Sequence, residues 1–580
     1  MSTIHEMHGG KLVAAVLQKN GIQHLFALCG GHISPILIAA DQAGIRVVDT
    51  RHEVTAVFAA DAAARLTGKI GVAAVTAGPG VTNTVTALKN AQMAQSPVLL
   101  IGGAAAVLLK GRGALQDIDH LGLVKGICKW SATCKTVRDI IPTLQKAIMA
   151  AKQDVPGPVF VEIPVDLLYQ QSVVTNWTLE MARGKGPMMG AMRNYLQFHL
   201  KNKFSRAWDQ QVSVVEPPCA MRPSDDSVRK VKAVLNWAER PLMIIGSQTL
   251  IDATRASELQ QAVVRMGVPT YLSGMARGLL GKHPLHLRHA RGKAIKEADV
   301  VILSGLPMDF RLGYGAGIPR KSTLVSINRS RRDLRMNRRP QVPILADPCE
   351  LICNLATLVG IAPLRWQQWH ADLLERDRQR DEEIERTACA TGDLVNPVRF
   401  LKQLDAVIDN DSILIGDGGD FVSTASYVVR PRSPLSWLDP GAFGTLGSGG
   451  GFALAAGCVR PKSEIWLLYG DGSCGYSLAE FDTYARHGIP VIAVVGNDGG
   501  WTQIAREQVD IFGTTLGTDL ARTHYEKVAE GYGGVGLRID RADQVECVLN
   551  DAKSLARTGK PVLVNVMLDK TDFRKGSISM

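Results

Sequence analysis

Short, largely apolar runs separated by segments with helical spacing recur along almost the whole chain. Val98–Ile101 and Val159–Ile163 are examples near the start, and Pro490–Val495 is one near the end. Runs of this length are typical of parallel strands that are buried on both faces, with helices between them. The pattern therefore predicts an α/β fold built on doubly wound parallel sheets.

The strand-like runs fall into three groups, which we interpret as three consecutive domains. A chain of 580 residues is too long for a single hydrophobic core. The expected segments are an N-terminal domain at 8–171, a basic linker at 172–223, a central domain at 224–360, a helical linker at 361–392, a C-terminal domain at 393–568 and a tail at 569–580.

The linker at 172–223 has a pattern of its own. Between Met181 and Trp208 it contains six basic residues and no acidic residue. Two interpretations stay open: a basic amphipathic helix within 181–208 that contacts an anionic membrane peripherally, or a linker helix packed on the neighbouring domain. The predicted apolar stripe of this helix recurs at every fourth position, at Met192, Leu196, Leu200, Phe204 and Trp208.

Composition narrows the class of protein. A hydrophobic content of 46% and a charged content of 21% are those of a globular protein. The net charge of +11 fits an anionic ligand or surface, but no zinc-finger spacing or Lys/Arg block indicates nucleic acid. Ten scattered cysteines, no signal peptide and no membrane-spanning apolar run predict an intracellular protein. We expect it in the cytoplasm, with the endoplasmic-reticulum surface as the alternative.

The strongest chemical signal is the string GDGSCGYSLAEFDTYARHGIPVIAVVGNDGGW, which begins at Gly470. Asp471 and Asn497 each follow an apolar run, so they are expected at the carboxyl ends of neighbouring strands, where open α/β sheets bind ligands. Their side-chain oxygens, with the Gly499 carbonyl, suit Mg²⁺, which takes few protein oxygens together with a phosphate. Gly472 lets the backbone come close to that phosphate.

This string resembles the signature of thiamine-diphosphate-dependent enzymes. Two other strings match the same family: His52-Glu53 before an Ala-rich helix with TAGPGVTN after it, and GAFGTLGSGGGFALAAG from Gly441. The resemblance implies bound thiamine diphosphate and Mg²⁺, in a fold of three α/β domains. It also implies a homodimer or homotetramer with active sites at the subunit interface.

The resemblance also implies roles for single residues. Glu53 would hydrogen-bond N1′ of the aminopyrimidine and drive proton transfer, and His32 and Gln116 would face the thiazolium. His32 is the candidate acid/base for a substrate hydroxyl, while a purely structural histidine at a helix entry stays open. The remaining implied cofactor contacts are Pro79, Asn83, Gly444 and Leu446 at the pyrimidine, and Gly419, Asp420, Gly472 and Ser473 at the diphosphate.

Further strings, such as GGHISPIL, WLDPGAFGTLG and TDFRKGSIS, are similar to a branch of acetolactate-synthase-like proteins that comprises 2-hydroxyacyl-CoA lyases of the second type. The implied reaction, in fatty acid α-oxidation and lipid metabolism, cleaves a 2-hydroxyacyl-CoA reversibly to formyl-CoA and an aldehyde shortened by one carbon. The basic tail (Lys570, Arg574, Lys575) would serve the CoA thioester.

Two questions stay open: which reaction the protein catalyses, and whether its central domain binds FAD or ADP. Acetolactate synthase acting on pyruvate is the competing enzyme, and a non-catalytic scaffold with bound cofactor is the competing class. The segment Ser304–Gly315 resembles the part of the family that binds FAD or ADP, and the sequence does not choose between them.

Overall fold

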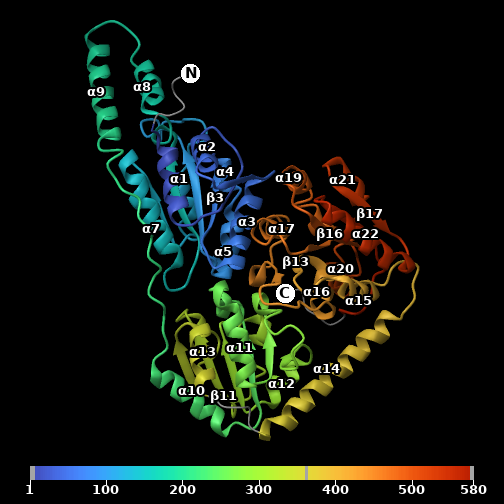
Figure 1. The fold of residues 1–580 in the computed structure, drawn as a ribbon. Coiled ribbons are helices and arrows are strands. Elements are labelled where there is room, and N and C mark those ends of the chain that lie inside the picture. Colours follow the sequence, from blue (N-terminus) through green and yellow to red (C-terminus); the bar gives the residue numbers. More distant parts are fainter. Residues whose placement is uncertain (1–6, 359–363, 575–580) are drawn as a thin grey trace. The chain divides into compact units, whose positions relative to one another are not determined.

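The structure is a computed structural model that describes residues 7–358 and 364–574. It divides into two compact units (Figure 1). Unit 1 runs to Cys219 and lacks only the short stretch Arg65–Gly68, whereas unit 2 contains that stretch and the chain from Ala220 onward. The described strands form three six-stranded sheets in which all pairings between named strands are parallel, so the predicted α/β fold class is confirmed.

The sheet of unit 1 has the strand order β2-β1-β3-β4-β6-β5. Strands β3, β4 and β6 are buried at every position, because helices cover both faces of the sheet. The strands are β1 (His24–Ala27), β2 (Arg46–Asp49), β3 (Gly71–Val75), β4 (Val98–Ala104), β5 (Trp130–Thr133) and β6 (Val159–Pro164); the helices are α1 (Gly9–Lys19), α2 (Ser34–Gln42), α3 (Glu53–Thr67), α4 (Pro79–Thr82), α5 (Val85–Ala94), α6 (His120–Val124) and α7 (Ile140–Lys152).

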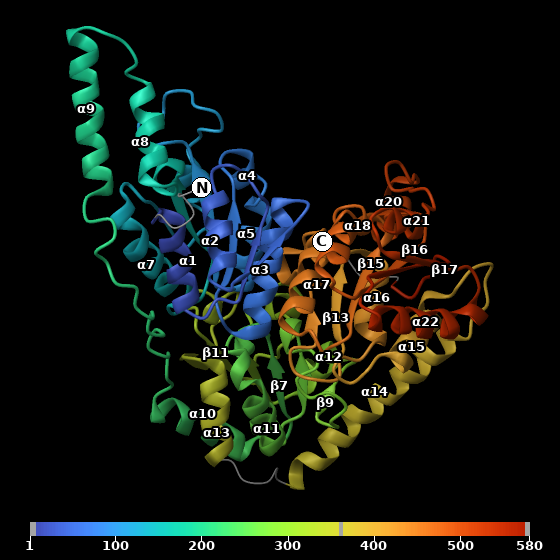
Figure 2. The same cartoon turned by 45° about the horizontal axis from the view of Figure 1, so that its top comes forward.

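Unit 1 ends in a helical hairpin of α8 (Gln171–Glu180) and α9 (Pro187–Phe204), which extends beyond the sheet (Figure 2). The predicted apolar stripe is only partly correct. Leu196, Leu200 and Phe204 are buried, and the latter two join the core of unit 1. Met192 is exposed, and Trp208 lies beyond the end of the helix, because α9 stops at Phe204. The buried part of the stripe therefore packs on the domain.

The first sheet of unit 2 has the order β12-β11-β10-β7-β8-β9, and its strands β7 and β10 are buried at every position. The elements are α10 (Asp225–Trp237), β7 (Pro241–Ile245), α11 (Ala256–Met266), β8 (Thr270–Leu272), β9 (His286–Leu287), α12 (Arg291–Glu297), β10 (Val300–Ser304), β11 (Thr323–Asn328), β12 (Val342–Leu345) and α13 (Pro348–Leu358). The long helix α14 (Gln367–Ala388) follows. Residues 359–363 of the predicted helical linker and the adjoining domain end lie outside the described residues.

The second sheet of unit 2 has the order β14-β13-β15-β16-β18-β17, so the chain changes direction between β13 and β15. Ligands bind at such switch points in open α/β sheets. The elements are α15 (Pro397–Val407), β13 (Ile413–Asp417), α16 (Gly419–Val428), β14 (Trp437–Leu438), α17 (Ser448–Val459), β15 (Ile465–Gly470), α18 (Asp471–Cys474), α19 (Glu480–His487), β16 (Val491–Asn497), α20 (Thr502–Phe512), α21 (Tyr525–Gly531), β17 (Val535–Ile539), α22 (Val545–Arg557) and β18 (Val562–Met567).

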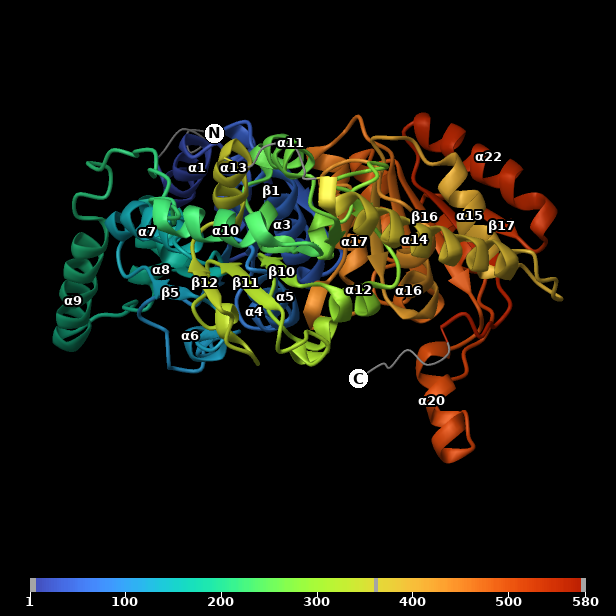
Figure 3. The same cartoon turned by 90° about the horizontal axis from the view of Figure 1, so that it is seen from below.

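Helix α20 extends away from the body of unit 2 (Figure 3), and most of its side chains are at least partly exposed. The ten cysteines, all within the described residues, form no disulfide there. Within residues 7–358 and 364–574, no helix combines the length and the apolar character needed to cross a bilayer.

One buried ion pair anchors the hairpin to unit 1. The Lys203 ammonium, on a side chain only 2% exposed, donates to the Asp166 carboxylate. We expect Lys203→Ala to destabilise unit 1 by about 3 kcal/mol, because the substitution leaves a buried carboxylate without its cation. Urea denaturation followed by circular dichroism checks this. Lys201→Ala, at an exposed position of the same helix, is the matched control and should change stability by less than about 0.5 kcal/mol. Equal stability of the two variants would contradict the anchoring role.

Candidate functional site

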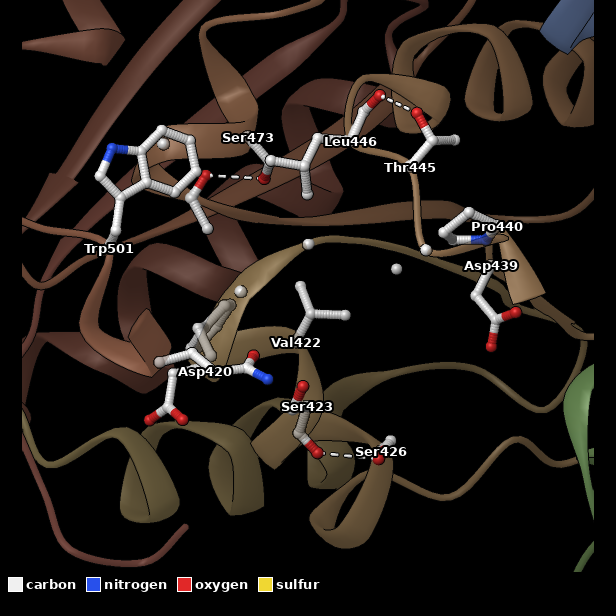
Figure 4. Close-up of a pocket in the computed structure, with 18 of the residues that line it drawn as sticks. Asp420, Val422, Ser423, Ser426, Asp439, Pro440, Thr445, Leu446, Ser473 and Trp501 are labelled. Carbon is white, nitrogen blue, oxygen red and sulfur yellow. Dashed lines mark hydrogen bonds between the residues drawn. The ribbon is translucent and has the colours of Figure 1, made fainter. Parts of the chain in front are cut away.

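A cavity of about 780 Å³ lies at the switch point of the second sheet of unit 2. The loops that follow β13, β14, β15 and β16 line it, together with Arg277, Phe310 and Tyr314 from the central part of the unit. Figure 4 shows Ser473 and Leu446 close together on one wall and the α16 residues Val422, Ser423 and Ser426 on another. Among the residues predicted from the sequence, this cavity collects Gly419, Asp420, Gly444, Leu446, Asp471, Gly472 and Ser473.

The two predicted side-chain ligands of the metal lie at the carboxyl ends of neighbouring strands, Asp471 directly after β15 and Asn497 as the last residue of β16. Gly470 of β15 pairs with Gly496 of β16, so the next residues, Asp471 and Asn497, lie side by side at one edge of the sheet. The Asp471 carboxylate accepts backbone N–H bonds from Gly499 at 2.9 Å and Gly500 at 3.0 Å. Burial, together with the nearby charge of Asp498, raises the pKa of Asp471 to about 6. A cation beside this carboxylate would favour its charged form.

The Asn497 amide is oriented by its nitrogen. Nδ2 donates to the Thr523 carbonyl and to Asn565 Oδ1, both at 3.2 Å. Oδ1 is buried and has no hydrogen-bond partner among the described residues. The Gly499 carbonyl accepts one N–H bond, from Leu520 at 3.0 Å, which leaves its second lone pair. A carboxylate, an amide oxygen and a carbonyl at one place are hard oxygen donors, so these residues fit Mg²⁺.

The N-terminus of α16 faces the same cavity. Gly418 and Gly419 have φ values of +75° and +84°, a conformation that glycine adopts without strain. The Asp420 carboxylate is occupied by a bidentate pair with Arg506, at 3.1 and 2.9 Å, which joins α16 to α20. The backbone N–H groups of the helix start are therefore the groups suited to a diphosphate here.

The loop after β15 is more constrained than predicted. The Ser473 hydroxyl donates to the carbonyls of Asp417 and Gly470, so its proton is directed at the backbone. A Cβ atom on Gly472 would lie 2.5 Å from the Trp501 ring, so only glycine fits beneath that side chain. The neighbour that requires glycine at this position is the Trp501 ring.

Asp417, which is missing from the predicted set, supports the Leu446 loop. Its two carboxylate oxygens accept N–H bonds from Gly447 at 3.0 Å and Gly449 at 2.8 Å, at the start of α17. Burial raises its pKa to about 7, and the two hydrogen bonds oppose the shift. The Leu446 side chain lies over Gly418, where an added Cβ would meet it at 2.3 Å. A carboxylate directly after an apolar strand is the signal that could have identified Asp417.

A second constellation lies in unit 1. Glu53 is the first residue of α3 and is only 8% exposed, and its Oε2 accepts a hydrogen bond from Asn83 Nδ2 at 3.0 Å. The structure thus brings together two residues that the sequence places 30 positions apart. Pro79, at the start of α4, and Asn83 are exposed. Together, Glu53 and Asn83 can form hydrogen bonds with the polar edge of a heterocyclic ring.

The turn before Pro79 carries Gln116. Gly78 has a φ of +59°, and an added Cβ would lie 2.8 Å from the Gln116 Cβ. Gln116 itself has a φ of +62°, which is uncommon for a residue with a side chain. The structure therefore places Gln116 against the Gly78–Pro79 turn, although the sequence separates them widely.

A buried network holds this turn and is missing from the predicted set. The Gly78 N–H donates to His120 Nε2 at 2.9 Å, so the ring proton is on Nδ1, 2.6 Å from Glu162 Oε2. Burial alone raises the pKa of Glu162, but hydrogen bonds from His120, Lys110 and Thr133 outweigh it and hold the pKa below its ordinary value. Glu162 is 0% exposed. An acidic residue inside an apolar strand was the only signal in the sequence.

His32 lies near this network. Its Nδ1 is 3.1 Å from the Thr76 hydroxyl, and burial, with the nearby His120, lowers its pKa below 6.5. The ring is therefore neutral near pH 7 and able to accept a proton.

Three family models match the chain. They describe the N-terminal TPP binding domain of thiamine pyrophosphate enzymes at residues 7–123, their central domain at 228–355 and their C-terminal TPP binding domain at 417–566. The matched segments contain the sheets and both constellations described above.

Several proteins are similar over nearly their whole length. A 2-hydroxyacyl-CoA lyase 2 of Bos taurus is 50% identical, over 100% of this chain and 93% of that protein. One of Caenorhabditis elegans is 49% identical, over 99% of this chain and 91% of that protein. A probable acetolactate synthase of Mycobacterium bovis is 33% identical, over 97% of this chain and 96% of that protein. The chain belongs to the thiamine pyrophosphate enzyme family.

Proposed function

We propose that this protein is a thiamine-diphosphate-dependent lyase that cleaves 2-hydroxyacyl-CoA thioesters reversibly to formyl-CoA and an aldehyde one carbon shorter. The observation that carries the substrate class is the similarity to lyases at about half identity over the whole chain, against 33% for an acetolactate synthase. This activity belongs to fatty acid α-oxidation in lipid metabolism. The ten free thiols suit the cytoplasm or the cytoplasmic surface of the endoplasmic reticulum.

The buried Asn497 oxygen without a partner supports the cofactor site. Asp471, Asn497 and the Gly499 carbonyl would hold Mg²⁺, and the start of α16 at Gly419 and Asp420, with Gly472 and Ser473, would receive the diphosphate. The Gly444 carbonyl and Leu446 would contact the pyrimidine, as would Pro79 and Asn83 of a second subunit. Bound thiamine diphosphate supplies the carbon nucleophile for the thioester carbonyl.

Side chains of the protein itself would transfer protons and orient the substrate. Glu53, held by Asn83, exchanges a proton with N1′ of the aminopyrimidine. His32, neutral because burial lowers its pKa, accepts the proton of the substrate hydroxyl while the C1–C2 bond breaks. Gln116 would orient the reacting end of the substrate from the Gly78 turn. These residues lie in unit 1, and the proposed active site combines them with unit 2 of the partner in a homodimer or homotetramer.

Charged groups of unit 2 support binding of an anionic nucleotide. A cavity of about 610 Å³ beside α12 and α16 is lined by six basic side chains: Arg277, Arg288, Arg291, Lys293, Arg376 and Arg380. Burial lowers the pKa of Arg288 to about 10, so an anion there would be stabilising. We assign the central part of unit 2 to ADP or FAD.

The described part of the tail supports a CoA contact. The Arg574 guanidinium lies 5.0 Å from the centre of the Tyr427 ring, on α16, which also lines both cavities. We assign Lys570 and Arg574 to the CoA phosphates. Lys575 lies outside the described residues.

A paired assay tests the reaction. Purified protein with thiamine diphosphate and Mg²⁺ should release an aldehyde and formyl-CoA or formate from a long-chain 2-hydroxyacyl-CoA, and should form no acetolactate from pyruvate. The reason is the proposed affinity for a CoA thioester. Acetolactate alone would make the protein a synthase, and no product in either tube, with cofactor bound, would favour a non-catalytic scaffold.

Two substitutions separate proton transfer from metal binding. Glu53→Gln should lower turnover by roughly a hundredfold or more while cofactor binding persists, because it removes only the ionisable group. Asp471→Ala should remove cofactor and Mg²⁺ binding together, since it deletes a metal ligand. Titration calorimetry with thiamine diphosphate and Mg²⁺ measures binding for both variants. Normal cofactor binding by Asp471→Ala would refute the metal assignment.

His32 gives a prediction with a pH readout. If His32 is the base, kcat/KM should fall on the acid side only below pH 6.5, because burial lowers its pKa and activity is lost as the ring becomes protonated. His32→Ala should slow cleavage roughly a hundredfold and abolish this acid limb. An unchanged rate and profile would leave His32 with a structural role only.

A further inference from the structure

The hairpin of α8 and α9 stands out from the sheet of unit 1 in Figures 1 and 2. Its base is fixed by the buried Lys203–Asp166 pair and by Leu200 and Phe204 in the core. The loop that joins the two helices, residues 181–186, is exposed except for Ala182. The hairpin is therefore an anchored element that presents its outer surface to the surroundings.

Helix α9 has two apolar faces. One contains Leu196 and Leu200 and packs on unit 1. The other contains Met188, Tyr195 and Phe198, which are 81%, 60% and 72% exposed. Residues at spacings of three, four and seven share one side of a helix, so these three side chains form a continuous exposed patch. We call it the outer face; clustered exposure of large apolar side chains usually marks a contact surface.

The surroundings of the outer face are basic. Between Met181 and Trp208 there are six Lys and Arg residues and no Asp or Glu. Three of the six pair with acidic residues: Arg183 with Glu180 at 2.5 Å, Arg206 with Asp209 at 3.4 Å, and the buried Lys203 with Asp166. Lys185, in the loop, and Lys201, one turn from Phe198, are exposed and have no carboxylate partner in the described part of the chain.

We propose that the outer face of α9 binds the surface of an anionic lipid bilayer. Met188, Tyr195 and Phe198 would enter the boundary between headgroups and acyl chains, and Lys185 and Lys201 would face the lipid phosphates. The helix would lie in the plane of the membrane and would not enter it end-on. The polar residues Asn194, Gln197 and Lys201 stand between the apolar ones along the sequence, so the helix is polar on one side over its length. This contact uses the face opposite to the one that packs on unit 1.

Charge favours a bilayer over a second copy of the chain. Two outer faces brought together would oppose the same unpaired lysines, in a protein with a net charge of +11. An anionic membrane instead provides many negative charges to the same surface, and attraction of this kind weakens as salt screens it.

Flotation of the full-length protein tests the proposal. The probes are vesicles of phosphatidylcholine alone and of phosphatidylcholine with roughly 30% phosphatidylserine, a surface that attracts basic segments. We expect flotation with the anionic vesicles at low salt, less at high salt, and little with the neutral ones. Y195S/F198S should reduce the bound fraction on the order of tenfold, and K185E/K201E should do so by a similar factor.

Trp237→Ser is the matched control, because Trp237 is a 52% exposed aromatic residue on α10 of unit 2. It should float like the unsubstituted protein, and urea denaturation should show that each variant is folded. Absence of flotation with anionic vesicles, or equal flotation of Y195S/F198S and the unsubstituted protein, would overturn the proposal. If Y195S/F198S instead changed the oligomeric state in sedimentation, without vesicle binding, the outer face would be an interface between copies.

Discussion

The pairing of β15 with β16 is the interaction on which the candidate site depends. Its register sets Gly470 opposite Gly496, so Asp471 at the start of α18 and Asn497 at the end of β16 lie at the same edge of the sheet. There is also no room for a side chain at Gly496, because a Cβ atom there would lie 2.3 Å from the Phe421 ring of α16. These glycines therefore let α16 come down onto the strand ends, and the start of α16 is then close to the two polar side chains.

This arrangement costs stability in the absence of a cation. Leaving one buried oxygen without a hydrogen bond costs about 1–3 kcal/mol, and Asn497 Oδ1 is such an atom. Burial also raises the pKa of Asp471, which means that its charged form is disfavoured. A divalent cation at the proposed site would remove both penalties.

Two further buried carboxylates, Asp417 and Glu162, stabilise backbone turns, Asp417 directly and Glu162 through His120. Asp417 accepts N–H bonds from the start of α17, and Glu162 orients His120, which in turn accepts the N–H of Gly78. Each fixes a glycine-rich turn next to a residue with a proposed chemical role, Leu446 in one case and Gln116 in the other. Turns of this kind have many accessible conformations, so a buried, charge-assisted hydrogen bond is an effective way to hold one of them.

The sequence by itself determined the parallel α/β architecture, because strands buried on both faces must be apolar almost throughout; the runs at Val98 and Val159 in the first sheet and at Pro490 in the last show this directly. It also determined that Asp471 and Asn497 lie together, since both follow such strands. Only the tertiary structure decided which residues hold the turns beside the other candidate site residues, such as the Gly78 turn beside Gln116. His120, Glu162 and Gly78 meet through contacts 42 positions apart, and no local pattern records such a contact. The same holds for α9: spacing predicts an apolar stripe, but burial depends on what packs against each face. The domain covers Leu200 and Phe204 and leaves Tyr195 and Phe198 exposed.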